Sequence, residues 1–140
     1  MEYLERKILK LKEDLTLVSI EGSGALLDIE KRCYYDLNDT AYFLLKLMEE
    51  GQHYETIVAE LVSEFNVSKE TARIDVGDLL DKLFKHGLLI VYEEKGEPLR
   101  KRSLIRGERP YHAPVCEYQK ELAVAGAQTP VTEITKPEIA

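Results

Sequence analysis

The chain has 140 residues, of which 44% are apolar and 32% are charged, so it can bury one core of ordinary size. Its net charge of −7 lies in residues 1–92, which hold 11 Lys/Arg against 18 Asp/Glu, because residues 93–140 hold 8 of each kind. Nucleic-acid binders normally present a basic face to phosphates, so this charge argues against a nucleic-acid partner. The sequence has no apolar run of membrane-spanning length and no signal-peptide pattern, which predicts a cytoplasmic protein without a membrane partner.

The N-terminal part of the chain predicts a small sheet. Residues 3–13 fit a helix or a strand, and both remain open. Residues 15–20 (LTLVSI) are rich in β-forming side chains, and two glycines place a turn after them. The next two segments show a period of two, with Ala25, Leu27 and Ile29 against Leu26, Asp28 and Glu30, and Cys33, Tyr35 and Leu37 against Tyr34 and Asp36. This period of two predicts three short antiparallel strands that turn one face to a core.

The central part predicts three amphipathic helices, each closed by a turn signal. The first begins at a cap by Asn38 or Asp39 and ends at Gly51, and the third begins at the cap Ser68 and ends at Gly87. A short apolar run, LLIVY, follows as a strand. The apolar residues at helical spacing are Ala41, Leu44, Leu45 and Met48, then Tyr54, Ile57, Val58, Leu61 and Phe65, then Ala72, Val76, Leu79, Leu80 and Leu83.

Together these elements predict an α+β fold of the winged helix-turn-helix type, in which a small three-stranded antiparallel sheet packs on three helices. We expect this domain to span residues 1–92. All five prolines lie beyond residue 97, and no amphipathic segment of useful length follows residue 92. Residues 93–140 are therefore expected to form a flexible, largely disordered tail.

The sequence gives no support for catalysis. His53, His86 and His112 have no metal-ligand spacing, and no glycine-rich phosphate loop is present. We therefore expect no catalytic residue, no metal, no cofactor and no enzymatic activity. Cys33 and Cys116 lie far apart in sequence, so a disulfide is not implied, and Cys33 is expected to be a small buried hydrophobe.

Four segments carry a family resemblance: residues 34–41 (YYDLNDTA), 57–61 (IVAEL), 76–83 (VGDLLDKL) and 85–89 (KHGLL). They resemble the PqqD family, also called the RiPP recognition element, which binds the leaders of ribosomally made and post-translationally modified peptides. The resemblance covers roughly residues 14–92, and the pattern Leu-Asn-x-Thr-Ala before a helix is its most specific part. Winged-helix domains share the later segments.

The resemblance implies that a leader peptide is added as an extra strand beside the third strand and lies against the third helix. An exposed strand edge suits this role, because its unpaired backbone groups bind an extended peptide of any sequence. Tyr34 and Tyr35 point to opposite faces, so one can belong to the core while the other lines the groove. Arg73 is expected to meet an acidic leader residue or to be an ordinary surface arginine. The expected peptide-binding residues are Cys33, Tyr34, Tyr35, Asp36, Arg73, Val76, Gly77 and Leu80.

One stretch of the tail, residues 109–122 (RPYHAPVCEYQKEL), resembles the Tyr-x-x-Pro motif in leaders of lasso and radical-SAM-modified peptides. Cys116 stands where an apolar residue is often found, and the glycine expected soon after is missing. Proline favours an extended chain and tyrosine gives a rigid anchor, so residues 111–122 can occupy the leader groove in cis or in a neighbouring copy. The leader-like residues are Tyr111, Pro114, Val115 and Leu122.

Two classes of function remain. The first is a non-catalytic adaptor, or peptide chaperone, that presents the leader of a precursor peptide to a modifying enzyme, with a radical-SAM protein as the expected partner. The second is a winged-helix transcription regulator or dimerisation module, which the negative charge disfavours. A tail that is itself a precursor-like substrate is a third alternative. An open sheet edge also allows self-association through the edge or the tail.

Overall fold

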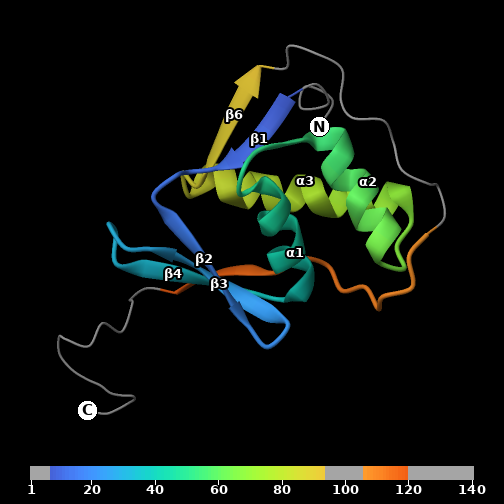
Figure 1. Cartoon of the computed structure of the whole chain (residues 1–140), viewed down its shortest axis with the longest axis horizontal. Coiled ribbons are helices and arrows are strands. Elements are labelled where there is room, and N and C mark those ends of the chain that lie inside the picture. The colour runs from blue at the N-terminus through green and yellow to red at the C-terminus, as the bar shows by residue number, and fades with distance from the viewer. Residues whose placement is uncertain (1–6, 94–105, 120–140) are drawn as a thin grey trace.

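The structure, a computed structural model, describes residues 7–93 and 106–119 (Figure 1). The predicted α+β class and the three predicted helices are confirmed. The elements in chain order are β1 (Lys7–Leu11), β2 (Leu15–Ile20), β3 (Ser23–Asp28), β4 (Cys33–Leu37), α1 (Asp39–Met48), β5 (Gln52–His53), α2 (Tyr54–Glu64), α3 (Lys69–Lys85), β6 (Leu89–Glu93) and β7 (Cys116–Gln119).

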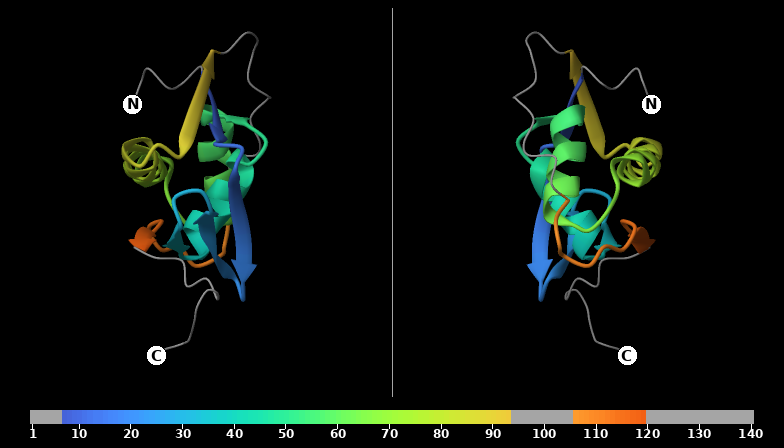
Figure 2. Two further views of the ribbon diagram at one scale, coloured as in Figure 1. Left: turned by 90° about the vertical axis from the view of Figure 1, so that its left-hand side faces the viewer. Right: turned by 90° about the vertical axis from the view of Figure 1, so that its right-hand side faces the viewer.

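Four strands form an antiparallel sheet in the order β2-β3-β4-β7. The first three are the strands that the alternating pattern predicted, and each pairs with its neighbour in sequence. The fourth strand, β7, comes from the predicted tail and pairs with β4. In Figure 2, β7 lies at the sheet edge near α3, and β2 lies at the other edge. The predicted three-stranded sheet is therefore wrong in its strand count, because the tail adds a strand to it.

A second antiparallel sheet has the order β5-β1-β6. Residues 3–13 fit either a helix or a strand in the sequence. Within them, Lys7–Leu11 is the central strand of this sheet and pairs with β6 along its whole length. Residues 3–6 lie outside the described part. The apolar run LLIVY that closes the predicted domain thus pairs with the N-terminal strand. The sequence analysis did not predict this second sheet.

The helices begin and end where local chemistry directs. The Asn38 side chain accepts a hydrogen bond from Ala41 N at 3.0 Å and caps α1, and Ser68 caps α3 by accepting from Thr71 N at 3.1 Å. Gly87, with a φ of 68°, follows α3 in the left-handed conformation that ends many helices. No helix within the described ranges is long and apolar enough to cross a membrane.

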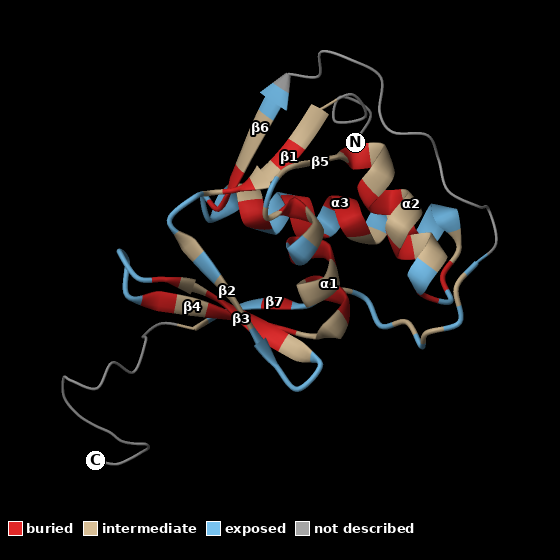
Figure 3. Ribbon diagram, in the orientation of Figure 1, coloured by how far each residue is buried: buried red, intermediate tan, exposed pale blue. Residues whose placement is uncertain are grey.

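The core lies between the helices and the inner faces of both sheets (Figure 3). The face of β4 that carries Cys33, Tyr35 and Leu37 is buried, as the alternation predicted. The apolar faces of α1, α2 and α3 meet it, which fixes how β4 and α3 lie relative to each other. The largest fully buried side chains of the core are Tyr54, Phe65, Leu9, Leu26, Leu44, Leu45, Met48, Ile57, Leu61, Leu80 and Leu83.

The tail departs from the prediction in one stretch. Residues 106–119 pack on the domain, where the sequence analysis expected a flexible segment. The contacts that hold them are backbone pairing, single polar anchors and isolated aromatic or thiol contacts, which leave no apolar periodicity in the sequence. Residues 94–105 and 120–140 lie outside the described part.

Candidate functional site

The candidate site is the edge of β4, where the tail is seated as an antiparallel strand. Cys116 lies opposite Leu37, and Gln119 lies opposite Tyr34 at the other end of the pairing. Before this strand, Tyr111 contacts Asp75 in the first half of α3. Within this strand, Tyr118 contacts His86 at the C-terminal end of the same helix, about 16 Å further along at 1.5 Å per residue. The tail therefore runs extended along α3 while it pairs with β4.

An aromatic cluster forms where β7 meets the end of α3. The Tyr35 ring packs edge-on against the His86 ring, with centroids 5.2 Å apart, and the Tyr35 Oη and His86 Nδ1 atoms are 3.4 Å apart. Tyr118 of β7 stacks on His86 at 5.6 Å and also contacts the Tyr35 ring at 5.5 Å. Burial raises the pKa of Tyr35 above its usual value, so its hydroxyl stays neutral.

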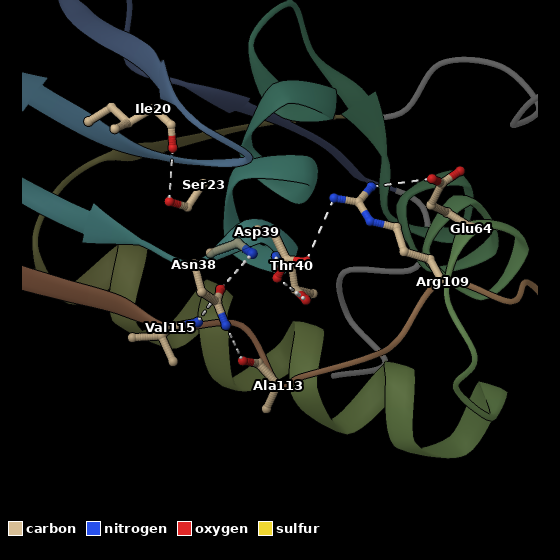
Figure 4. A network of polar contacts seen from close by, with 10 residues as sticks. Ile20, Ser23, Asn38, Asp39, Thr40, Glu64, Arg109, Ala113 and Val115 are labelled. Carbon is tan, nitrogen blue, oxygen red and sulfur yellow. Dashed lines mark hydrogen bonds and ion pairs between the residues drawn. The ribbon is translucent and has the colours of Figure 1, made fainter.

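Asn38 joins the tail to the start of α1 (Figure 4). Its Oδ1 accepts hydrogen bonds from Ala41 N and, at 2.9 Å, from Val115 N. Its Nδ2 donates to Ala113 O at 2.8 Å, and its backbone N donates to Val115 O at 3.2 Å. One side chain thus caps a helix and holds two backbone groups of the tail.

Tyr111 anchors the tail before β7. Its hydroxyl donates a hydrogen bond of 2.6 Å to Asp75 Oδ2, and its ring meets Phe65 edge-on with centroids 6.0 Å apart. Burial, followed by the bond to the Asp75 carboxylate, raises the pKa of Tyr111. The side chain therefore acts as a neutral anchor.

The tail also completes the C-terminal end of α2. The last carbonyls of a helix lack intrahelical partners, and here Gly107 N donates to Val62 O at 2.8 Å and Arg109 N donates to Glu64 O at 3.2 Å. The tail backbone comes so close that a Cβ on Gly107 would overlap the backbone of Ser63 and Glu64. We call residues 107–111 the anchor segment.

Arg109 adds charge contacts to the anchor segment. Its guanidinium lies 4.5 Å from the centre of the Phe65 ring, and it pairs with Glu64 at 3.2 Å and with Asp39 at 3.7 Å (Figure 4). The three charged side chains, Arg109, Glu64 and Asp39, are all partly exposed, so each ion pair is worth about 1 kcal/mol or less. Together they fix the direction in which the tail leaves α2.

The predicted residues of β4 all lie at this edge. Cys33 and Tyr35 are buried on the inner face, whereas Tyr34 is half-buried and Asp36 is exposed on the outer face. Asp36 lies opposite Glu117 and accepts a hydrogen bond from Gln119 Nε2 at 3.1 Å. Tyr35 contacts the tail through Tyr118, so here the buried tyrosine is both core and contact.

The predicted residues of α3 are placed differently. Val76, Gly77 and Leu80 are buried in the helix face that packs into the core. Arg73 forms an ion pair with Glu55 of α2 at 2.9 Å and lies over the Tyr54 ring at 5.7 Å. It therefore points toward α2, and the tail is met instead by residues of the same helix that the sequence analysis did not single out.

The leader-like residues of the tail fall into three situations. Tyr111 is anchored as described, Pro114 is half-buried, and Val115 is exposed although Asn38 binds its backbone. Leu122 lies outside the described residues. In this structure residues 116–119 pair with β4 of the same chain. Cys116 takes a buried position beside Leu37, and burial raises its pKa to about 11, so it behaves as an apolar residue.

Sequence reasoning missed several residues that hold the tail, namely Gly107, Arg109, Asn38 in its second role, Asp75, His86 and Tyr118. Gly107 itself was a usable signal, because a glycine permits a close backbone approach. The partners on the domain gave none, since exposed polar side chains look alike in sequence.

The described residues contain no candidate metal site. Within them, no group of three or more His, Cys, Asp or Glu side chains could hold a metal ion. Cys33 and Cys116 are both free thiols. The arrangement can hold an extended chain by backbone pairing on one side and by side-chain contacts with α3 on the other.

Comparison with known proteins gives one match. The family model described as coenzyme PQQ synthesis protein D (PqqD) matches residues 24–89, which run from β3 into β6 and include β4 and α3. The matched stretch ends before the anchor segment. No curated protein and no solved structure matches the chain.

Proposed function

Because residues 24–89 belong to the PqqD family, we propose that this protein is a non-catalytic adaptor that binds the leader of a ribosomally made, post-translationally modified peptide. The leader is added to β4 as an antiparallel strand, at the place where β7 lies in the free chain. One observation carries this proposal: an extended segment already pairs with β4 over four residue pairs, so the edge accepts an added strand.

The chemistry of the edge suits a peptide ligand. Backbone pairing with β4 gives affinity that tolerates many sequences, while the side chains along α3 select among them. Asn38 supplies one donor and one acceptor to an incoming backbone, and Tyr35 with His86 offers an aromatic surface to its side chains. The excess negative charge of residues 1–92 favours this ligand over nucleic acid.

We further propose that the bound leader is presented to a modifying enzyme. Holding the precursor next to the enzyme raises its local concentration and fixes its orientation, with no chemistry required of the adaptor. The likeness of residues 111–114 to the Tyr-x-x-Pro motif makes a radical-SAM protein the expected partner.

The test uses a synthetic peptide with the sequence of residues 109–122, in which valine replaces Cys116. It is titrated into the full chain carrying Glu117→Pro, because proline removes a backbone N–H from β7 and disables that strand. We expect amide chemical-shift changes concentrated in β4 and α3. Absence of binding would overturn the proposed function.

The same samples test the regulator and dimerisation alternative. The full chain is applied to heparin and to duplex DNA at moderate salt, and its mass is measured by sedimentation. We expect the chain to be a monomer that neither heparin nor duplex DNA retains. Firm retention together with no peptide binding would favour a winged-helix regulator, and a peptide-insensitive dimer would favour a dimerisation module.

A further inference from the structure

We infer that β7 is an internal competitor for the β4 edge, which an incoming leader must displace while the anchor segment stays in place. The inference rests on the proposed function, since it concerns the same edge. It adds a regulatory step and a selection rule: leaders that carry a basic or neutral residue opposite Asp36 displace β7 best.

The first observation is a like-charge pair in the β4–β7 ladder. Asp36 and Glu117 lie directly opposite each other, and both are exposed on the outer face. Like charges directly opposite across two strands destabilise the pairing by about 0.2–1 kcal/mol. The bond from Gln119 to Asp36 offsets part of this cost. The tail is thus an imperfect partner for the edge it fills.

The second observation is how little of β7 is buried. Of its four residues, Cys116 is buried, whereas Glu117 and Tyr118 are exposed, and Tyr118 keeps 49% of its surface open to solvent. The preceding Val115 is 40% exposed. A strand with one buried small side chain gains little apolar burial, so its pairing depends mainly on backbone hydrogen bonds.

The third observation is the contrast with the anchor segment. Its backbone caps α2, its tyrosine reaches Asp75, and Gly107 is seated against the helix backbone. If the anchor segment left α2, the carbonyls that now accept hydrogen bonds from Gly107 and Arg109 would lose their partners. Removing β7 alone costs none of these contacts.

The anchor makes a weak strand competitive. Residues 112–115 tether β7 within reach of the edge, and short tethers give an effective concentration on the order of millimolar. If β7 itself has an intrinsic Kd of about 100 μM for the edge, any competing peptide would therefore bind the full chain about tenfold more weakly than it binds the open edge. Weak, nonspecific peptides are excluded, while a leader with better contacts still enters.

Cys116 reports the exchange directly. It is buried when β7 is paired, so alkylating reagents reach it only when β7 leaves the edge. Cys33 is buried on the inner face of β4 and serves as an internal control, because its modification would signal unfolding of the whole domain.

The experiment uses the full chain and two versions of the peptide of residues 109–122, both with valine in place of Cys116. One keeps Glu117, and the other carries Glu117→Lys. Site-resolved alkylation is followed by mass spectrometry, and affinities are measured for the full chain, for its Glu117→Pro variant and for the matched control Glu117→Gln.

We expect both peptides to speed alkylation of Cys116 but not of Cys33, with the lysine version effective at the lower concentration. We also expect the Glu117→Pro chain to bind about tenfold more tightly than the full chain. Glu117→Gln keeps the backbone N–H and relieves the repulsion from Asp36, so it should bind the peptide no more tightly than the full chain. The inference is overturned if peptides bind both chains equally and leave Cys116 protected. Such a result would still support the proposed function, whereas no binding to either chain would overturn both.

Strand exchange between copies is checked in the same series. If β7 is seated in cis, protection of Cys116 is independent of protein concentration. If protection falls on dilution and sedimentation shows a dimer, β7 of a second copy pairs with β4. That result would overturn the inference that β7 competes as a tethered strand of the same chain.

Discussion

The anchor segment and β7 belong to one stretch of tail, yet they attach to the domain in different ways. The anchor segment satisfies helix-end carbonyls, buries part of a tyrosine and fits a glycine against backbone. β7 pairs along an edge, places Glu117 opposite Asp36 and leaves Tyr118 half-exposed. A segment that completes the fold is costly to remove, whereas one that only extends a sheet can be exchanged.

Breaking the anchor should have the largest effect. Gly107→Ala places a Cβ where the backbone of Ser63 and Glu64 lies, and it forces the two capping hydrogen bonds apart. We expect the free energy of unfolding to fall by about 2–4 kcal/mol. Urea denaturation of both proteins measures this.

The neighbouring variant Glu108→Ala is the matched control, because Glu108 is exposed in the same segment. It should leave the unfolding midpoint nearly unchanged. Equal stability of Gly107→Ala and the parent chain would show that the anchor contributes nothing to the fold.

Asn38 separates helix capping from tail binding. Asn38→Ala removes the cap of α1 and both side-chain bonds to the tail, so we expect a loss of about 2–3 kcal/mol. Asn38→Asp keeps an oxygen for Ala41 N and Val115 N but loses the donor to Ala113 O. Asp should therefore retain α1 and raise Cys116 alkylation, and an Asp variant that is as unstable as Ala would contradict this division.

Alkaline pH should release β7 before it unfolds the domain. Burial raises the pKa of Cys116 from 9.0 to about 11, since a thiolate is disfavoured beside Leu37. A raised pKa means that docking is at full strength below about pH 9 and weakens as pH rises toward about 11, by no more than about 3 kcal/mol. The raised pKa of Tyr111 acts with the same sign.

Methyl NMR signals of Val115 and Leu37 follow this transition without using the thiol. Cys116→Val removes the ionising group while keeping an apolar side chain. If the variant loosens over the same pH range as strongly as the parent chain, the thiol is not the cause.

The smallest effect should come from the charge pair. Glu117→Lys replaces a repulsive contact with an attractive one opposite Asp36 and should strengthen β7 docking by about 0.5–1 kcal/mol. This corresponds to about a twofold to fivefold slower alkylation of Cys116. Combining the change with Asp36→Asn completes a double-mutant cycle. A coupling energy of zero would show that the two side chains do not influence each other in β7 docking.

Much of the fold could be predicted from local patterns. The alternation in residues 25–29 and 33–37 and the cap residues Asn38 and Ser68 give the strands β3 and β4 and the starts of α1 and α3. The partner of Lys7–Leu11 could not be predicted in this way. Its pairing with β6 joins distant parts of the chain, and no local period encodes that contact.

The site was predictable in outline but not in its contacts. The likeness of residues 111–114 to a leader pointed to the tail as an occupant of the β4 edge. Arg73 was assigned by spacing alone, and its carboxylate partner on α2 draws it away from the tail. Asp75 lies two residues further along α3, which turns it to nearly the opposite side, where it meets Tyr111.

The side-chain amide of Asn38 sets the register of the backbone that pairs with β4. It holds a carbonyl and an N–H two residues apart, at Ala113 and Val115, and so works as a ruler for the incoming backbone. A slip of one residue would turn every side chain of the guest to the other face. For a leader bound as proposed, this fixed register would decide which alternate side chains face α3.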